Sequence, residues 1–243
     1  LWSADTLDLG AATVTGDYLV YAGTSIDDSG AQIITGDAAF KTHDDSSQIT
    51  IDHPSNSFGG TVSYVGGIGF TVNDTDATGF VLVGRTLVGN LVVTAAGPVT
   101  QSGALIVGGF TSISATGQNV TLTDASNDFK QEVRLTGAAV EIVDTNGIDL
   151  GASTVTGTYQ VTAGGAVTNS GTQEITGVTT ITAGSSNNIT LDHATNNFAA
   201  AVEIASGNDV AITDEDAIIL GASTVSGTYD ITAGGAVTNS GTL

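Results

Sequence analysis

The sequence predicts an all-β protein built as a parallel β-helix, also called a β-solenoid. A unit of about 70 residues repeats along the chain, each unit contains short runs of alternating apolar and polar residues, and turn-forming residues separate these runs. The composition agrees, because the 243 residues include 33 glycines and only 2 prolines. Val, Ile and Thr, whose branched side chains favour strands, are abundant.

The repeat is clearest in the second half of the chain. The segment LGASTVTGTYQVTAGGAVTNSGT, which begins at Leu150, returns at Leu220 with changes only at Thr156, Gln160 and Val161. Looser copies begin at Leu9 and Val83. We therefore divide the chain into approximate repeats 1–79, 80–147, 148–217 and 218–243, the last one partial. We expect residues 1–243 to form one continuous solenoid section, a fragment of a longer array.

Two further parts of the unit also recur. The segments ITIDHPSNSF, VTLTDASNDF and ITLDHATNNF end at Phe58, Phe129 and Phe198. We expect these three rings to fill one recurring corner of the core. A third part of the unit ends, with equal spacing between its copies, at Asp74, Asp144 and Asp214.

Each unit divides into three similar stretches, and each stretch, at about 23 residues, has the size of one β-helix coil. We therefore expect about three coils per repeat and roughly ten coils in all. At a spacing of about 4.8 Å between coils, these form a rod on the order of 50 Å long. Paired β-sandwiches or a β-propeller fit less well, because a sandwich domain needs about 100 residues and a propeller blade takes about 40 to 50.

The charge of the chain excludes several kinds of partner. Twenty-five acidic residues stand against four basic ones, a formal net charge of -21, so binding to nucleic acid or to an anionic membrane surface is not expected. No stretch approaches the roughly 20 apolar residues of a membrane-spanning helix, and insertion into a membrane is not expected. The absence of cysteine excludes disulfides and thiolate metal sites.

Calcium is the cation that suits the acidic turns, because it takes about six to eight oxygen ligands from carboxylates and carbonyls. The candidate metal ligands are Asp74, Asp76, Asp214 and Asp216. The pairs Asp27–Asp28 and Asp44–Asp45 are weaker candidates. A diffuse cloud of counterions is the alternative, and we expect no other cofactor.

We expect no enzymatic activity and assign no catalytic residue. His53 and His193 each follow an aspartate, but at three coils per repeat they lie about 29 Å apart along the rod. The carboxylates of a glycosidase lie about 5 to 9.5 Å apart. In the expected rod, by contrast, Asp74, Asp144 and Asp214 are about 14 Å from one another.

The repeated segments, together with ITAGSSNNITLDHATNNF and ITDEDAIILG, resemble the degenerate repeats of filamentous-haemagglutinin-type exoproteins. They are also similar to the Gly-, Thr-, Val- and Asn-rich arrays of giant bacterial surface adhesins, and the resemblance covers essentially the whole chain. It implies a right-handed β-helix, export from the cell and a place in a long extracellular stalk.

We therefore expect a structural stalk of a large secreted or cell-surface bacterial adhesin that mediates attachment or cell-cell contact. Its partners are then receptors or glycans, of a host or a neighbouring cell, contacted through other parts of the parent protein, and rods can associate end to end or laterally. The alternatives are a surface module that binds glycans or Ca2+, a polysaccharide-active β-helix enzyme and an ice-binding protein. A glycan-binding face would involve the tyrosines Tyr18, Tyr21, Tyr64, Tyr159 and Tyr229.

Overall fold

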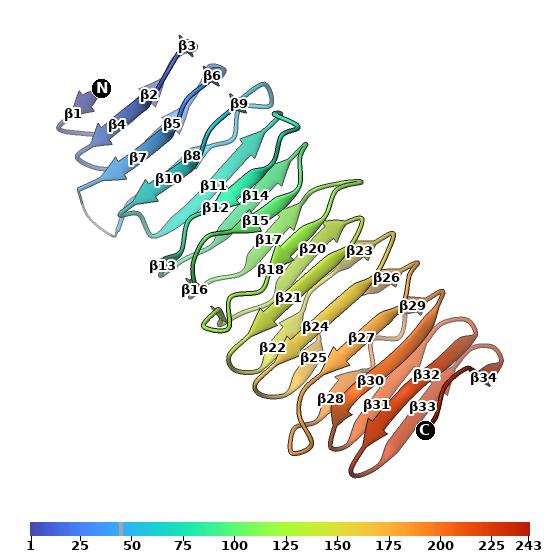
Figure 1. Ribbon diagram of the computed structural model, residues 1–243. Helices are drawn as coiled ribbons and strands as arrows, with labels where there is room; N and C mark the ends of the chain where they lie inside the picture. Colours follow the sequence, from blue (N-terminus) through green and yellow to red (C-terminus); the bar gives the residue numbers. More distant parts are fainter. Residues whose placement is uncertain (44–45) are drawn as a thin grey trace.

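The computed structural model describes residues 1–43 and 46–243, which form a β-solenoid of about 12 turns (Figure 1). Parallel strands stack along one axis, with the first and last turns at opposite ends of the rod. In the described residues the secondary structure is entirely strands and turns, and no helix there is long and apolar enough to cross a membrane. The predicted solenoid is confirmed, with about 12 turns in place of roughly ten.

One broad face of the rod, face 1, is a parallel ladder that runs through every turn. Leu7 pairs with Ile26, and Ile26 pairs with Ile49, so successive turns differ in length. The strands of face 1 in the described part of the chain are β2 (Leu7–Leu9), β5 (Ile26–Asp28), β8 (Gln48–Ile51), β11 (Gly69–Asp74), β14 (Leu91–Ala95), β17 (Thr111–Ser114), β20 (Val133–Gly137), β22 (Ile148–Leu150), β25 (Val167–Asn169), β28 (Ile189–Leu191), β31 (Val210–Asp214) and β33 (Tyr229–Ala233).

The opposite broad face, face 2, consists of two successive sheets. The first sheet contains β1 (Trp2–Ser3), β4 (Tyr18–Ala22), β7 (Ala38–Thr42) and β10 (Val62–Val65). The second contains β12 (Phe80–Leu82), β15 (Val99–Gln101), β18 (Val120–Leu122), β21 (Val140–Asp144), β24 (Tyr159–Ala163), β27 (Thr179–Thr182), β30 (Ala201–Gly207), β32 (Ile218–Val225) and β34 (Val237–Asn239). In the described residues β10 and β12 are neighbours that do not pair, so the ladder of face 2 is interrupted there.

Short strands line the two narrow edges of the rod in three groups. The groups are β3 (Ala12–Val14), β6 (Gln32–Ile34) and β9 (Ser57–Phe58); β13 (Arg85–Leu87), β16 (Leu105–Val107) and β19 (Asp128–Phe129); and β23 (Ser153–Val155), β26 (Gln173–Ile175) and β29 (Asn197–Phe198). The first and third groups lie on one edge, whereas β13 and β16 lie on the opposite edge (Figure 1).

This alternation of edges follows from the length of the repeat. Equivalent residues of successive repeats lie on opposite faces: Tyr159 is on face 2 and Tyr229 on face 1. Along face 1, seven steps lead from β2 through β5, β8, β11, β14, β17 and β20 to β22, its equivalent two repeats later. Each repeat therefore takes three and a half turns, where we predicted about three.

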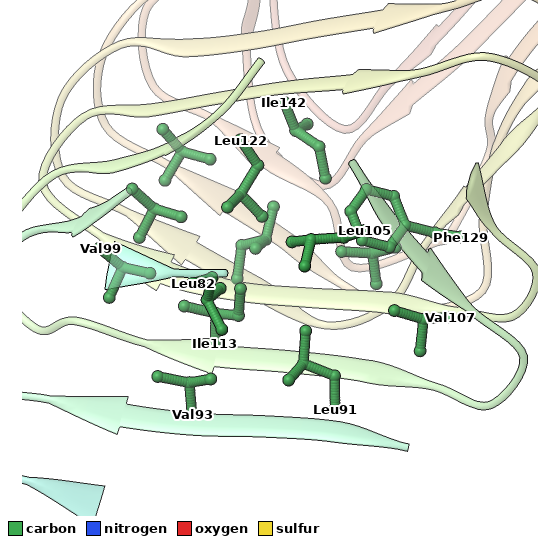
Figure 2. Packing of buried hydrophobic residues seen from close by; sticks show 14 of the residues in the cluster. Leu82, Leu91, Val93, Val99, Leu105, Val107, Ile113, Leu122, Phe129 and Ile142 are labelled. Carbon is green, nitrogen blue, oxygen red and sulfur yellow. The ribbon is translucent and has the colours of Figure 1, made fainter. Parts of the chain in front are cut away.

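The core lies between the two broad faces. Alternate residues of each strand point inward, as expected for a period of two, and Figure 2 shows Leu91 and Val93 among inward side chains of neighbouring turns. Both are at most 1% exposed. The corner phenylalanines are also buried as predicted, at 1%, 2% and 1% exposure for Phe58, Phe129 and Phe198.

Glycine is required where the corners of successive turns touch. A Cβ atom on Gly171 would lie 2.2 Å from the backbone nitrogen of Ala152, one turn earlier. Gly241 approaches Ala222 at the same distance in the next repeat. Gly30 makes the same approach to Ala11 in the first repeat, which explains why glycine recurs at this corner.

We expect Gly171→Ala to lower the free energy of unfolding by about 1 to 3 kcal/mol, because its methyl group must push two backbone segments apart. Gly10→Ala is the matched control, since a Cβ there meets nothing within 4 Å. Urea denaturation followed by circular dichroism measures both variants. Equal stability of the two would contradict the close packing at this corner.

Candidate functional site

A cluster of polar side chains, the polar corner, recurs inside the solenoid once in each complete repeat. Each copy combines an acid or amide, an asparagine and an aspartate from three successive turns. The three copies are Asp28, Asn56 and Asp74; Gln101, Asn127 and Asp144; and Asn169, Asn196 and Asp214. All of these residues except the half-buried Gln101 are buried.

The central asparagine connects three turns. In the third copy, Asn196 Nδ2 donates to the carbonyl of Leu191 at 3.0 Å within its own turn. Its Oδ1 accepts from the backbone N–H of Gln173 at 3.0 Å and from Asn169 Nδ2 at 2.8 Å, both one turn earlier. Its backbone carbonyl accepts from Glu215 N–H in the following turn. The corner thus supplies hydrogen bonds where the chain leaves the regular ladder.

The aspartate of each corner accepts backbone hydrogen bonds. Asp144 Oδ2 accepts from Phe129 N–H at 2.8 Å, and its Oδ1 accepts from Asn146 N–H at 2.7 Å. Asp214 repeats this pattern with Phe198 and Asp216. These carboxylates fix the edge strand that carries the corner phenylalanine and the turn that follows the aspartate.

The proposed calcium ligands therefore occupy two separate corners. Asp74 and Asp214 are buried, while Asp76 is half-buried and Asp216 is exposed. Within each pair, the later residue donates its backbone N–H to the earlier carboxylate. The two pairs lie seven turns apart on face 1, about 34 Å along the axis. Calcium binding at these residues stays a prediction.

Burial sets the acidity of several corner carboxyls. It raises the pKa of Asp28, Asp74 and Asp144, because removal from water disfavours the charged form. Hydrogen bonds from backbone N–H groups oppose this rise at all three positions. In contrast, the hydroxyl and N–H of Thr78 lower the pKa of Asp76.

Three carboxylates converge at the first polar corner. Oxygens of Asp27, Asp28 and Asp52 lie within 4.8 Å of one another. Asp28 is buried, accepting from Asn56 Nδ2 at 2.6 Å and from Asp52 N–H at 2.9 Å, whereas Asp27 and Asp52 are exposed. The Asp27–Asp28 pair was a weaker candidate from sequence. Asp52 was missed because it joins the pair only through turn stacking, from the turn that follows Asp28.

The remaining candidates are dispersed. His53 and His193 lie seven turns apart, about 34 Å rather than the predicted 29 Å. His193 Nδ1 contacts Thr195 Oγ1 at 3.1 Å in its own turn. Tyr64 and Tyr159 are buried at 1% and 0% exposure, so they line no outer face. The pair Asp44–Asp45 lies outside the described residues.

The comparisons with known proteins give a family without an activity. A family model described as repeats of unknown function (DUF5649) matches residues 1–65, 69–136, 137–205 and 207–243. No curated protein and no solved structure matches the chain. The family match therefore agrees with the internal repetition seen in the sequence.

We expect Asp144→Asn to be less stable than Asp74→Asn by about 1 to 3 kcal/mol. Both oxygens of Asp144 accept backbone N–H groups, so an amide must turn its NH2 toward one of these donors. Asp74 accepts both of its bonds on Oδ1, and its buried Oδ2 has no partner, which leaves room for the amide nitrogen. Urea denaturation at pH 7 measures the difference, and equal stabilities would contradict the assigned pattern of hydrogen bonds.

We expect the melting temperature to fall as the pH rises from about 4 to 7. The folded pKa of Asp28, Asp74 and Asp144 is raised, so the folded chain holds more protons than the unfolded chain in this window. Their contribution to stability is therefore lost with increasing pH. Calorimetry in about 0.5 M NaCl, which screens the net charge, tests this. The slope should be smaller for Asp74→Asn, and a melting temperature that rises through this window would contradict the prediction.

Proposed function

The chain belongs to this family of repeats of unknown function, and on that premise we propose that it is a stiff spacer in a large secreted or cell-surface bacterial adhesin. The observation that carries the proposal is the uninterrupted ladder of face 1, which joins all of the turns into one body. Such a segment holds binding regions elsewhere in the parent protein at a distance from the cell.

Stiffness follows from how the turns are joined. Eleven steps of about 4.8 Å separate β2 from β33, so the ladder of face 1 is about 53 Å long. Bending the rod must stretch inter-turn hydrogen bonds on one side and compress a close-packed core on the other. The polar corners add bonds between turns at the edges, where the ladders end.

The outer surface suits an extracellular rod. The net charge of -21 favours solubility. The resemblance of the repeated segments to filamentous-haemagglutinin-type repeats supports export and a role in attachment. Receptors or glycans are then bound by other parts of the parent protein, and contacts between rods are end to end or lateral.

Protease shaving of intact source cells tests the proposal. We expect peptides from these repeats in the released fraction, identified by mass spectrometry, and a parent band of hundreds of kilodaltons on a large-pore gel. A cytoplasmic marker protein must stay intact in the same sample. Repeat peptides released only after lysis, or a free protein near 24.1 kDa, would contradict the surface spacer.

A further inference from the structure

The junction between the first and second repeats differs from the rest of the rod. Here face 2 is interrupted between β10 and β12, while face 1 continues through β8, β11 and β14. The segment between the first two family matches, 66–68, forms the turn at this point, with Gly66 and Gly67 at φ 77° and 82°. We call this junction, residues 64–68 with residues 81–88, the seam.

An open strand edge borders the seam. In the described chain β13 pairs only with β16, as the outermost strand of its three-stranded sheet. Arg85 N–H donates to Ala104, and the carbonyl of Leu87 accepts from Gly108 N–H, so both residues face β16. Alternate residues of a strand point their backbone groups to opposite sides. The N–H and C=O of the exposed Thr86 therefore point to the unpaired side.

A hollow adjoins this edge. A cavity of about 660 Å³ is lined by Tyr64 and Gly66 from one turn and by Gly84, Arg85 and Thr86 from the next. Its volume is in the range of sites that hold small ligands or short peptide segments. The ring of Tyr64 stacks on that of Phe70, with 4.0 Å between the ring centroids. The hydroxyl of Tyr64 is buried and makes no hydrogen bond.

Arg85 is the basic residue of the seam in an acidic protein. Among the residues that the structure describes, two of the four bases form ion pairs, Lys130 with Asp128 and Arg134 with Glu132. Within the described residues Arg85 has no ion pair, and its buried Nε has no hydrogen-bond partner. Burial raises the pKa of Tyr64, and the positive charge of Arg85 partly offsets this rise. A guanidinium without a carboxylate in such a chain is complementary to an acidic ligand.

Exposed apolar side chains gather at the same place. Away from the two ends of the rod, the large hydrophobic side chains with substantial exposure in the described chain are Ile68 (36%), Val81 (36%) and Val88 (65%). All three belong to the seam, close in sequence to residues that line the cavity. Together with the open backbone edge, they favour an extended peptide, since a peptide can continue a ladder and offer apolar side chains at alternate positions. A saccharide would favour an exposed ring, whereas Tyr64 and Phe70 are both buried.

We propose that the seam binds an extended segment of a partner protein, which adds to the open edge of β13 and places an acidic side chain against Arg85. Thr86 supplies the backbone hydrogen bonds, and Ile68, Val81 and Val88 contact apolar side chains of the segment. This site is independent of the proposed spacer function, because it depends on the local interruption of face 2.

Nuclear magnetic resonance tests the site with a defined probe. The 15N-labelled chain is titrated with the blocked hexapeptide acetyl-Ser-Val-Glu-Val-Thr-Val-amide, and with the same peptide carrying Gln in place of Glu. We expect saturable shifts of the Val65, Arg85 and Thr86 amide signals, and affinity weaker by about tenfold or more for the Gln peptide. Shifts confined to β33 and β34 would overturn the proposal, because they would place the peptide at the end of the rod.

Two variants distinguish a specific contact with Arg85 from a general effect of the net charge. Arg85→Gln should lower the affinity for the Glu peptide by about tenfold or more. The same variant should bind the Gln peptide as tightly as the unsubstituted chain does. Lys130→Gln, which changes the net charge equally at an exposed base paired with Asp128, should bind as the unsubstituted chain does. Circular dichroism confirms the fold of both variants, and the comparison of the two peptides on the unsubstituted chain needs no variant.

Several results would overturn the proposal. These are the absence of saturable shifts at millimolar peptide, equal affinity for the Glu and Gln peptides, and unchanged affinity in Arg85→Gln. Shifts of the seam signals by a glucuronate tetrasaccharide but not by the Glu peptide would assign the site to an acidic saccharide. Protein-concentration-dependent shifts of the same signals without peptide, with dimers in sedimentation, would identify a second copy as the occupant.

Discussion

Backbone pairing between successive turns, about 4.8 Å apart, is the constraint on which the rest of the structure depends. It places each residue directly above and below residues of the neighbouring turns. Inward positions therefore form columns, such as Val72, Val93, Ile113 and Leu135, which pair in sequence along face 1. A column tolerates only side chains that fit the same space in each turn, which is why the Val, Ile and Leu positions recur. The same spacing makes glycine necessary at corners where two backbones meet.

The polar corners show how this constraint is met where the chain turns. A corner takes backbone groups out of the ladder, and buried groups without partners are costly. Asparagine can satisfy these backbone groups, because one side-chain amide can donate to its own turn and accept from the turn before, as Asn196 does. The aspartates serve as acceptors only, and burial makes their charged form unfavourable. The corners that tie the turns together are thus also a part of the fold whose contribution to stability falls as the pH rises.

The sequence predicted the architecture better than its dimensions. Alternation and repetition indicated parallel coils, and the recurrence of Phe58, Phe129 and Phe198 indicated a buried corner. The half turn was missed, because the strands that end at Asp74, Asp144 and Asp214 look like the close of a third coil. Each is in fact an additional half turn on the face where its own repeat begins, so the next repeat begins on the opposite face. Asp52 and the open edge of β13 were also missed. Both depend on which residues stack one turn apart, and the unequal turn lengths hide this spacing from a linear sequence.

The half turn in each repeat gives the array the symmetry of a two-fold screw. Equivalent surfaces of adjacent repeats face opposite directions, and they face the same direction again only after two repeats. A change in the number of repeats therefore alters more than the reach of the rod. Loss or gain of one repeat would turn the surfaces of all following repeats to the opposite side of the rod. Loss or gain of two repeats would leave those surfaces facing the same direction. In an array of this kind, odd and even changes in copy number are physically different events.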